Sequence, residues 1–336
     1  MKKQNLIVGL LSLGTIVSGL TGCADGNDQV VVYTAAEEER IDYLKKELSA
    51  KFPDVQVVFQ AIGTGTLVTK LQAEGQSTDC DIFYDLEACN AQRLVSENAD
   101  LFYDLGTDYD FSIYDSSVMG YASSHHKFAV NGKTCGAIVT SKKVLAEAGL
   151  STPKTYEDLL NEKFKNLIVM PNPKSSGTGY AFYNGVVSSK GEDYAKTYFA
   201  SLNENVKEYT TSGSAPIKSV NKGEIAAAVC MLWQGVEYAN ENDDLEVVFL
   251  DNEASYNLFT MGIINGKEKK DNVKKVFDYL YNDLNEKEVT KYNPDKIYKD
   301  QGASEIPNYP TGFSEINMGG VFDFEYKQKL LDAWKY

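Results

Sequence analysis

Histidine is nearly absent from this chain, and its scarcity weakens the case for several classes of enzyme. The 336 residues contain two histidines, His125 and His126, which stand next to each other in a polar stretch. A serine triad needs a histidine beside its nucleophile, and neither a Gly-x-Ser-x-Gly nor a His-Glu-x-x-His motif occurs. A histidine-based metal site would need help from carboxylates. The scarcity of histidine and the lack of these motifs argue against a hydrolase, and we expect no enzymatic activity, no cofactor and no resident metal.

Cysteine is scarce as well. Beyond Cys23 the chain has four widely separated cysteines and no Cys-x-x-Cys spacing, so a zinc cluster is not expected. An exported chain can form disulfides, but four cysteines allow three full pairings and the sequence selects none of them. Burial as small apolar side chains is an equal alternative. These four residues are Cys80, Cys89, Cys135 and Cys230.

Positive charge is also in deficit. The chain has 33 lysines and arginines against 48 aspartates and glutamates, which gives a net charge of −15. Nucleic acids and anionic membrane surfaces both attract basic patches. We therefore expect no nucleic-acid partner, and any membrane attachment would depend on lipid and not on charge.

The apolar run near the N-terminus is too short for a comfortable transmembrane helix. It covers residues 6–20, about 15 residues, whereas about 20 are needed to span a bilayer. Lys2 and Lys3 precede this run, and Leu20-Thr21-Gly22-Cys23 ends it with a motif that resembles a bacterial lipobox.

This arrangement predicts a lipoprotein. Residues 1–22 would be the signal peptide, Cys23 would carry the lipid, and residues 23–29 would form a tether. Loss of the two leader lysines brings the net charge to −17. The mature protein would then work outside the cytoplasm, lipid-anchored to the cell membrane.

The rest of the chain alternates between predicted strands and amphipathic helices. About 314 residues follow the leader, enough for two domains of about 150 residues each. Such alternation implies α/β lobes with mainly parallel sheets. The patterns predict strands at 30–33, 55–59, 81–84, 167–170, 225–230, 247–250 and 259–264, and helices that begin near residues 37, 67, 177, 234 and 273.

Four loops between a predicted strand and a helix suit an anion. They are 33–35, 63–66, 175–180 and 211–215, and the last three are rich in glycine, serine and threonine. A helix N-terminus presents unpaired N–H groups and about half a positive charge, and hydroxyls add donors. Each loop alone could be an ordinary helix cap. Lys174, beside the third loop, could add a positive charge to an anion contact or could be an ordinary surface lysine. Together the four loops favour a cleft for a carboxylate, phosphate or phosphonate.

Several stretches resemble the extracytoplasmic solute-binding proteins of ABC importers, in the group that binds ferric iron, 2-aminoethylphosphonate or sugar phosphates. The resemblance covers about residues 30–284. The matching stretches are Val31-Val32-Tyr33-Thr34, Leu67 to Glu74 followed by Asp81-Ile82, Met170-Pro171-Asn172-Pro173 leading into Ser176-Gly177-Thr178-Gly179-Tyr180, and Lys222-Gly223-Glu224-Ile225-Ala226.

This resemblance implies a fold and a division into domains. The fold would be α/β, with two doubly wound α/β lobes and a ligand cleft between them, as in type II periplasmic binding proteins. Lobe 1 would comprise residues 30–118 and 251–300, and lobe 2 would comprise 119–250 and 301–336.

The resemblance also implies a ligand site. The expected ligand-binding residues are Tyr33, Thr34, Gly65, Thr66, Ser176, Gly177, Thr178, Ser212, Gly213, Ser214, Gln234 and Glu237. An amine on the solute would need a carboxylate or an aromatic face. Asp85, Glu87, Glu237, Trp233 and Tyr180 are available for it by sequence position.

One departure from the family bears on the solute. Ferric-binding members carry adjacent tyrosines after the strand equivalent to 225–230, whereas this chain has Leu232-Trp233-Gln234-Gly235-Val236-Glu237-Tyr238 there. A phosphonate or phosphorylated solute therefore fits better than iron, which stays the alternative. The expected partners are this small anionic solute and the permease and ATPase of the same importer, and the protein is expected to be a monomer. An exported hydrolase or a surface adhesin is less favoured.

The missing tyrosine pair generates a first prediction. Because Fe(III) would lack paired phenolate ligands, adding ferric citrate to the protein should give no strong visible charge-transfer band. An absorption titration measures this directly, and a strong band would overturn the prediction.

Overall fold

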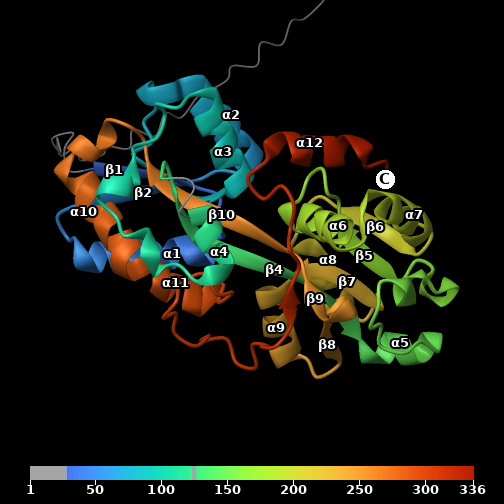
Figure 1. Ribbon diagram of the computed structural model, residues 1–336. Helices are drawn as coiled ribbons and strands as arrows, with labels where there is room; N and C mark the ends of the chain where they lie inside the picture. Colours follow the sequence, from blue (N-terminus) through green and yellow to red (C-terminus); the bar gives the residue numbers. More distant parts are fainter. Residues whose placement is uncertain (1–28, 123–125) are drawn as a thin grey trace, which may run out of the picture.

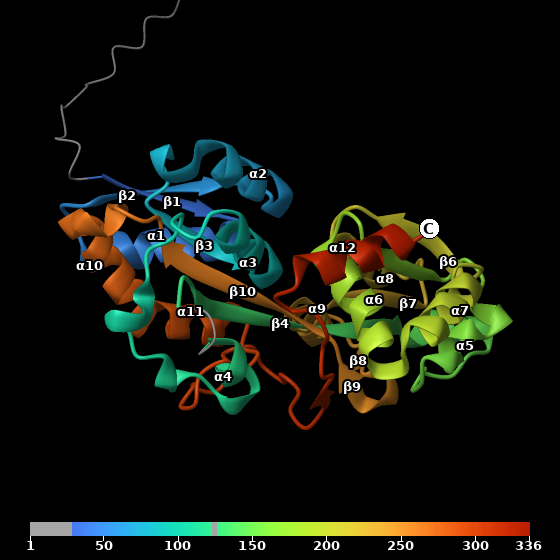
Figure 2. The same cartoon turned by 45° about the horizontal axis from the view of Figure 1, so that its top comes forward.

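The computed structural model describes residues 29–122 and 126–336, so the predicted signal peptide, Cys23 and His125 lie outside it. Two groups of strands and helices lie side by side, and two long strands run between them (Figures 1 and 2). The predicted α/β fold with two lobes is confirmed. The exact residue boundaries of the lobes stay a prediction.

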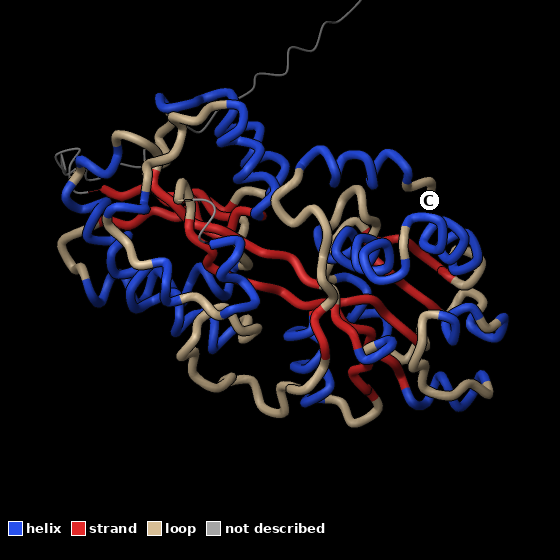
Figure 3. The backbone as a smooth tube through the Cα atoms, in the orientation of Figure 1, coloured by secondary structure: helices blue, strands red, loops and turns tan. Residues whose placement is uncertain are grey.

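Most strands of the described chain belong to one twisted sheet that passes through both lobes (Figure 3). The strands are β1 (Gln29–Thr34), β2 (Gln56–Ala61), β3 (Ile82–Glu87), β4 (Ala129–Ser141), β5 (Ile168–Pro171), β6 (Val206–Thr210), β7 (Ala227–Met231), β8 (Leu245–Val248), β9 (Glu253–Ala254), β10 (Tyr256–Ile263) and β11 (Ser314–Glu315). The sheet has the order β2-β1-β3-β10-β4-β7-β5-β6, with β8 paired to β4. We use lobe 1 for the part around β1, β2 and β3, and lobe 2 for the part around β5, β6, β7 and β8.

The helices cover both faces of these strands. They are α1 (Glu38–Lys51), α2 (Thr64–Glu74), α3 (Ala88–Glu97), α4 (Ser116–Ala122), α5 (Lys142–Ala148), α6 (Gly177–Lys190), α7 (Glu192–Leu202), α8 (Ala215–Asn221), α9 (Leu232–Glu241), α10 (Asp271–Tyr279), α11 (Asn285–Tyr292) and α12 (Phe324–Ala333). A π-helical turn, Leu280–Leu284, joins α10 to α11. No helix in the described ranges is both long and apolar enough to cross a membrane.

Local sequence explains α1 well. Glu38 and Glu39 occupy its first turn, where negative charge complements the positive end of the helix dipole. Leu44 and Leu48 are fully buried against the sheet, as their helical spacing predicts. The helix ends one residue before Phe52, whose N–H still donates to the carbonyl of Leu48 at 2.8 Å.

Strand β4 is the main element that the sequence pattern missed. Its first half, up to Cys135, pairs antiparallel with β10, and its second half, from Gly136, pairs with β7 and β8. Asn131 and Lys133 interrupt the alternation of apolar residues, yet both are almost completely buried. A strand that crosses from one lobe to the other is covered on both faces. Its sequence therefore lacks the alternation of apolar and polar residues that marks a half-buried strand.

Each lobe has its own apolar core. The core of lobe 1 includes Leu44 on α1 and Phe277 on α10. The core of lobe 2 includes Phe199 on α7, and the C-terminal helix α12 contributes Leu330 to it while Trp334 follows just beyond the helix. The chain therefore returns to lobe 2 at its end, where α12 lies over α6 and α7 and also reaches α3 of lobe 1 (Figure 1).

The four cysteines of the described chain are buried free thiols, so no disulfide joins them. They are Cys80, Cys89, Cys135 and Cys230. Burial raises the pKa of each thiol, and that of Cys230 reaches about 12. The alternative that treats them as small buried side chains is the one the structure bears out.

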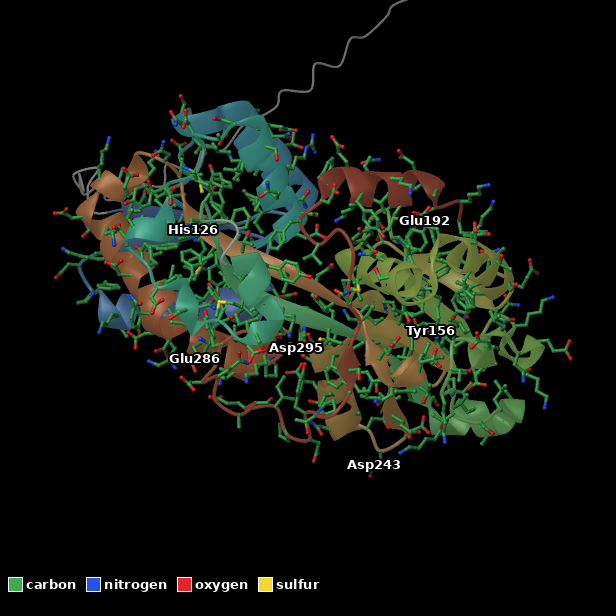
Figure 4. The ribbon with its side chains drawn as sticks, viewed as in Figure 1. His126, Tyr156, Glu192, Asp243, Glu286 and Asp295 are labelled. Atoms are coloured by element: carbon green, nitrogen blue, oxygen red, sulfur yellow. The ribbon has the colours of Figure 1, made fainter. Side chains whose placement is uncertain are left out.

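A buried carboxylate supports the crossing strand. Asp295, labelled in Figure 4, accepts the N–H of Cys135 at 2.6 Å and the hydroxyl of Tyr309 at 2.9 Å. Burial raises its pKa to about 6, although both hydrogen bonds pull in the opposite direction. The folded protein therefore holds a proton on Asp295 more tightly than the unfolded chain does.

This shift predicts a pH-dependent stability. Because the folded pKa lies above the unfolded one, the stabilisation is present below about pH 4 and is lost as the pH rises to about 6. Asp295→Asn removes this titration. As the pH rises from about 4 to about 7, the free energy of unfolding of wild type should therefore fall by about 2–3 kcal/mol relative to that of the variant. Urea denaturation across this range measures the difference. The exposed Asp243 of lobe 2 supplies the control, Asp243→Asn, which should follow the wild-type profile (Figure 4). A constant difference for Asp295→Asn would contradict the prediction.

Candidate functional site

The carboxyl ends of the parallel strands in the two lobes face one another, and the helices that follow those strands begin there. In lobe 1, β1 leads into α1 and β2 into α2, and in lobe 2, β5, β6 and β7 lead into α6, α8 and α9. Open α/β sheets place ligands at such strand ends, where loops enter helix N-termini. The arrangement brings segments that are far apart in the sequence to one place.

A cavity of about 410 Å³ lies at this meeting point. Lobe 1 supplies Ala35, Glu37, Arg40, Thr64 and Asp85 to its lining. Lobe 2 supplies Ser175, Ser176, Gly177, Thr178, Ala181, Thr211, Ser212, Gly213, Ser214, Met231, Trp233 and Gln234. The crossing strands close the space between them with Thr134, Cys135, Gly136, Asn257 and Phe259.

The loop before α6 is folded by its own polar side chains. The side-chain oxygen of Asn172 accepts a hydrogen bond from the N–H of Lys174 at 2.9 Å. The backbone carbonyl of Asn172 accepts one from the N–H of Ser176, also at 2.9 Å. Ser176 caps the helix, because its Oγ accepts the N–H of Gly179 at 3.4 Å. A Cβ at Gly179 would meet the carbonyl oxygen of Pro171 at 2.4 Å, so this close return of the helix onto β5 requires glycine.

The second loop, 211–214, packs directly against the first. A Cβ at Gly213 would lie 2.4 Å from Oγ1 of Thr178 and 3.1 Å from Oγ of Ser176. The hydroxyls of Ser212 and Ser214 are 2.9 Å apart. The two loops therefore form one surface of hydroxyls and backbone groups on the lobe 2 side of the cavity, a surface without a charged side chain.

The charged side chains of the cavity lie on the lobe 1 side, and they form ion pairs with one another. The buried guanidinium of Arg40 donates to Glu288, to Asp85 at 2.9 Å and to Glu37 at 3.1 Å. Burial opposes its charge, yet the three carboxylates raise the pKa of Arg40 above its usual value. Among the described residues that line the cavity, Arg40 is the one cation, and each of its three nitrogens donates to a carboxylate.

Asp85 has an unusual backbone. Its φ of 62° lies in the left-handed region, which aspartate tolerates better than most residues. Burial raises the pKa of its carboxyl to about 6, against the attraction of Arg40. The described lining of the lobe 1 wall thus has two carboxyl groups, on Asp85 and Glu37, against the one guanidinium of Arg40.

Part of the predicted ligand site lies together in the structure. Seven of the twelve predicted residues line the cavity: Ser176, Gly177, Thr178, Ser212, Gly213, Ser214 and Gln234. Of the positions suggested for an amine, Asp85 and Trp233 also line it, whereas Glu87 and Tyr180 lie outside the lining. Lys174, beside the first loop, is exposed and does not reach it.

The other five predicted residues do not line the cavity. Tyr33 and Thr34 are buried at the end of β1, where Oγ1 of Thr34 accepts the N–H of Ala36 at 3.1 Å. Gly65 and Thr66 are exposed in the first turn of α2 and are not part of the lining, whereas their neighbour Thr64 is. Glu237 is half-buried further along α9, where burial raises its pKa. A ligand role for these five stays a prediction.

Some cavity residues were missed from the sequence altogether. From the sequence, Glu37 and Arg40 are expected to be solvent-facing charges at the start of α1. Only the buried partners Asp85 and Glu288 distinguish Arg40. Asn257 and Phe259 come from β10, whose crossing role no local pattern reveals. Asn257 also donates to the carbonyl of Gly177 at 2.8 Å, which ties the crossing strand to the first loop.

The described residues give no support to an iron site. No group of three or more histidine, cysteine, aspartate or glutamate side chains in 29–122 and 126–336 is placed to hold a metal ion. No tyrosine is among the described residues that line the cavity. His126 lies on lobe 1 with its ring against Phe111, at a centroid distance of 4.9 Å (Figure 4).

Known proteins resemble this chain over most of its length. An uncharacterized protein of Haemophilus influenzae is 24% identical over 357 aligned positions, which cover 99% of this chain and 97% of that protein. A putative 2-aminoethylphosphonate-binding periplasmic protein of Salmonella typhi is 23% identical and aligns over 65% of this chain and 62% of its own length. The periplasmic binding protein AfuA of Actinobacillus pleuropneumoniae, solved with exogenous fructose-6-phosphate bound, has a TM-score of 0.76 and 21% identity over 91% of this chain and 97% of that one, which shows a shared fold. A family model for bacterial extracellular solute-binding proteins matches residues 35–287, and the chain belongs to this family.

Proposed function

We propose that this protein is the solute-binding component of an ABC importer. It captures a small anionic solute, a phosphonate or a phosphorylated compound, between its lobes and delivers it to a membrane permease and its ATPase. The observation that carries the proposal is the pair of loops 175–178 and 211–214, which present hydroxyls and backbone groups to one interlobe cavity. The names of the relatives support the same class of solute, since they include a 2-aminoethylphosphonate binder and a protein solved with fructose-6-phosphate.

The chemistry of these loops suits an oxyanion. Neutral donors can bind a charged group without a cationic side chain, and each hydrogen bond to an ionised group contributes about 1.5–3 kcal/mol. The N-terminus of α6, a helix of 14 residues, adds the positive end of its dipole beside Ser176. Arg40, the one cation in the described lining, is held by three carboxylates, so we assign the anion to the neutral donors.

The lobe 1 wall suits a positive or hydroxyl-bearing part of the solute. Glu37 and Asp85 present acceptors there, and Gln234 on the opposite lobe has a buried side-chain oxygen without a hydrogen-bond partner. A solute with an anionic head and an amine or hydroxyls at its other end would satisfy both walls. An aminophosphonate and a sugar phosphate both have this form.

Binding is favoured over catalysis in this cavity. Its serines and threonines have no histidine beside them to act as a base among the lining residues of 29–122 and 126–336. The thiol of Cys135 is buried with a raised pKa, the opposite of an activated nucleophile. The two crossing strands instead suit a hinge, about which the lobes close on the solute.

The cellular localisation of the protein is proposed from its sequence. The lipobox at Cys23 supports a lipid anchor on the cell membrane, followed by a tether that ends near residue 29 where β1 begins. A binder held there would stay close to its permease. We propose that it acts as a monomer, because each cavity wall comes from the same chain.

A thermal-shift panel tests the solute class. Inorganic phosphate, 2-aminoethylphosphonate, fructose-6-phosphate and ferric citrate are added separately, and a phosphonate or phosphate ester should raise the unfolding temperature. A solute at 100 times its Kd stabilises by about 2.7 kcal/mol. Ser176→Ala and Thr178→Val should each weaken the affinity about tenfold by removing one donor.

The controls come from exposed hydroxyls on α7. Ser201→Ala and Thr197→Val remove the same groups where the hydroxyls bond only to backbone carbonyls of the preceding helical turn. Both controls should bind as wild type does. Unchanged affinity in both cavity variants would sink the assignment of the site, and stabilisation by ferric citrate alone would redirect the function toward iron.

The lipid anchor has its own test. Cys23→Ser removes the acceptor thiol, so in a bacterial host the protein should move from the membrane fraction to the soluble exported fraction and lose incorporation of labelled fatty acid. Cys80→Ser leaves the lipobox intact and serves as the control. If the Cys23 variant stays membrane-bound and labelled, the lipid lies elsewhere.

A further inference from the structure

The C-terminal helix α12 touches both lobes. It is anchored on lobe 2, where Leu330 and the following Trp334 enter the core. On its other side it meets α3 of lobe 1, and the guanidinium of Arg93 lies 4.2 Å from the ring centroid of Phe324 (Figures 1 and 2). It is thus a bridge between the lobes besides the crossing strands β4 and β10.

A buried ion pair lies at the centre of this bridge. The ammonium of Lys327 on α12 donates to both carboxylate oxygens of Glu87, each at 2.6 Å. Glu87 is the last residue of β3 in lobe 1, and Asn90 donates to it at 2.9 Å. Lys327 and Glu87 are only 9% and 7% exposed, so this is not a solvated surface pair.

The same ammonium also contacts the helix that carries the first cavity loop. It lies 4.5 Å from the ring centroid of Tyr180, in a cation–π arrangement. Tyr180 stands in the first turn of α6, and its N–H donates to the carbonyl of Ser176, the helix cap. Burial disfavours the charge, but attraction to Glu87 wins and raises the pKa of Lys327, so the residue stays cationic.

We propose that Lys327 is a positioning residue for solute binding, because its ion pair with Glu87 holds the two lobes in the arrangement that gives the cavity both of its walls. Neither side chain lines the cavity. Lys327 acts through Glu87 at the end of β3 and through Tyr180 behind the loop at Ser176. This inference rests on the proposed function in one respect, since solute affinity is one of its two readouts.

The physical reason is a shift of populations. If the solute binds only when the lobes are so arranged, its apparent Kd equals the intrinsic Kd divided by the fraction of molecules in that arrangement. Breaking a buried pair leaves the other charge without its partner, and the protein can relieve this by letting the lobes separate and water enter. Affinity then falls although every group that touches the solute is intact.

Solute affinity is compared in Lys327→Met, Glu87→Gln and the double variant, with 2-aminoethylphosphonate and fructose-6-phosphate as probes. Each single variant should raise the apparent Kd about tenfold, which corresponds to a fall of the competent fraction to about one tenth. The double variant leaves no unpaired charge, so it should fold even if a single variant does not, and its Kd should rise no further than in the singles. The control is Lys329→Met on the same helix, because Lys329 pairs with Glu192 at the exposed surface of lobe 2 and should leave the Kd unchanged (Figure 4).

The arrangement of the lobes is measured separately, without solute. Spin labels are placed at two exposed alanines, Ala50→Cys on α1 and Ala200→Cys on α7, in a Cys23→Ser background. The four remaining native thiols are buried, so labelling is selective. Wild type and Lys329→Met should give one narrow distance distribution, and the Lys327 and Glu87 variants a broader or displaced one.

The outcomes separate the two proposals. If wild type binds neither probe, the proposed solute class fails while the distance measurement still decides the role of Lys327. Wild-type affinity together with an unchanged distance distribution in Lys327→Met, or in the double variant if the single does not fold, would overturn the positioning role. Loss of affinity with unchanged distances would also overturn it, because Lys327 would then act within lobe 2 alone.

Discussion

The antiparallel pairing of β4 with β10 is the constraint on which the site depends. β4 continues beyond this pairing into the sheet of lobe 2, and β10 also pairs with β3 in lobe 1, so one hydrogen-bonded ladder fixes how the two half-sheets face each other. Because the parallel strands of both lobes end toward this ladder, the helices that follow them begin around one cavity. Asp295, which is not part of either strand, accepts a hydrogen bond from the N–H of Cys135, at the point where β4 passes from one lobe to the other.

The two walls of the cavity differ in their chemistry for a physical reason. Lobe 2 presents hydroxyls and backbone groups on loops packed so closely that Gly213 and Gly179 could not carry a side chain without displacing a neighbour. Lobe 1 presents carboxylates, and its guanidinium, that of Arg40, donates hydrogen bonds to carboxylates of the same lobe. In the proposed function, neutral donors on one side hold the anion, and the opposite side attracts a donor or a positive group. In that proposed function, the two halves of such a solute are recognised by different lobes, which ties solute binding to the arrangement of the lobes.

Local patterns were enough to predict a good part of the fold. The spacing of Leu44 and Leu48 predicted α1, and the residues around Ser176 to Thr178 predicted the start of a helix, because a cap and its turn are made by residues close in sequence. The ligand role of this loop stays a prediction. The same reasoning stopped short at Thr34 and Gly65. Both stand beside a strand or helix end, but the side of the turn that faces the other lobe is set by packing, and there Ala35 and Thr64 take the place.

The sequence by itself determined the alternation of strands and helices, the donor-rich loops, and the absence of the paired tyrosines of the iron binders. Only the tertiary structure decided that Arg40 is neutralised, that β4 links the lobes, and that Lys327 reaches Glu87 from 240 positions away. The reason is one of range: caps and helix faces depend on neighbours within a turn, whereas buried charge pairs and crossing strands depend on partners that only the completed fold brings together.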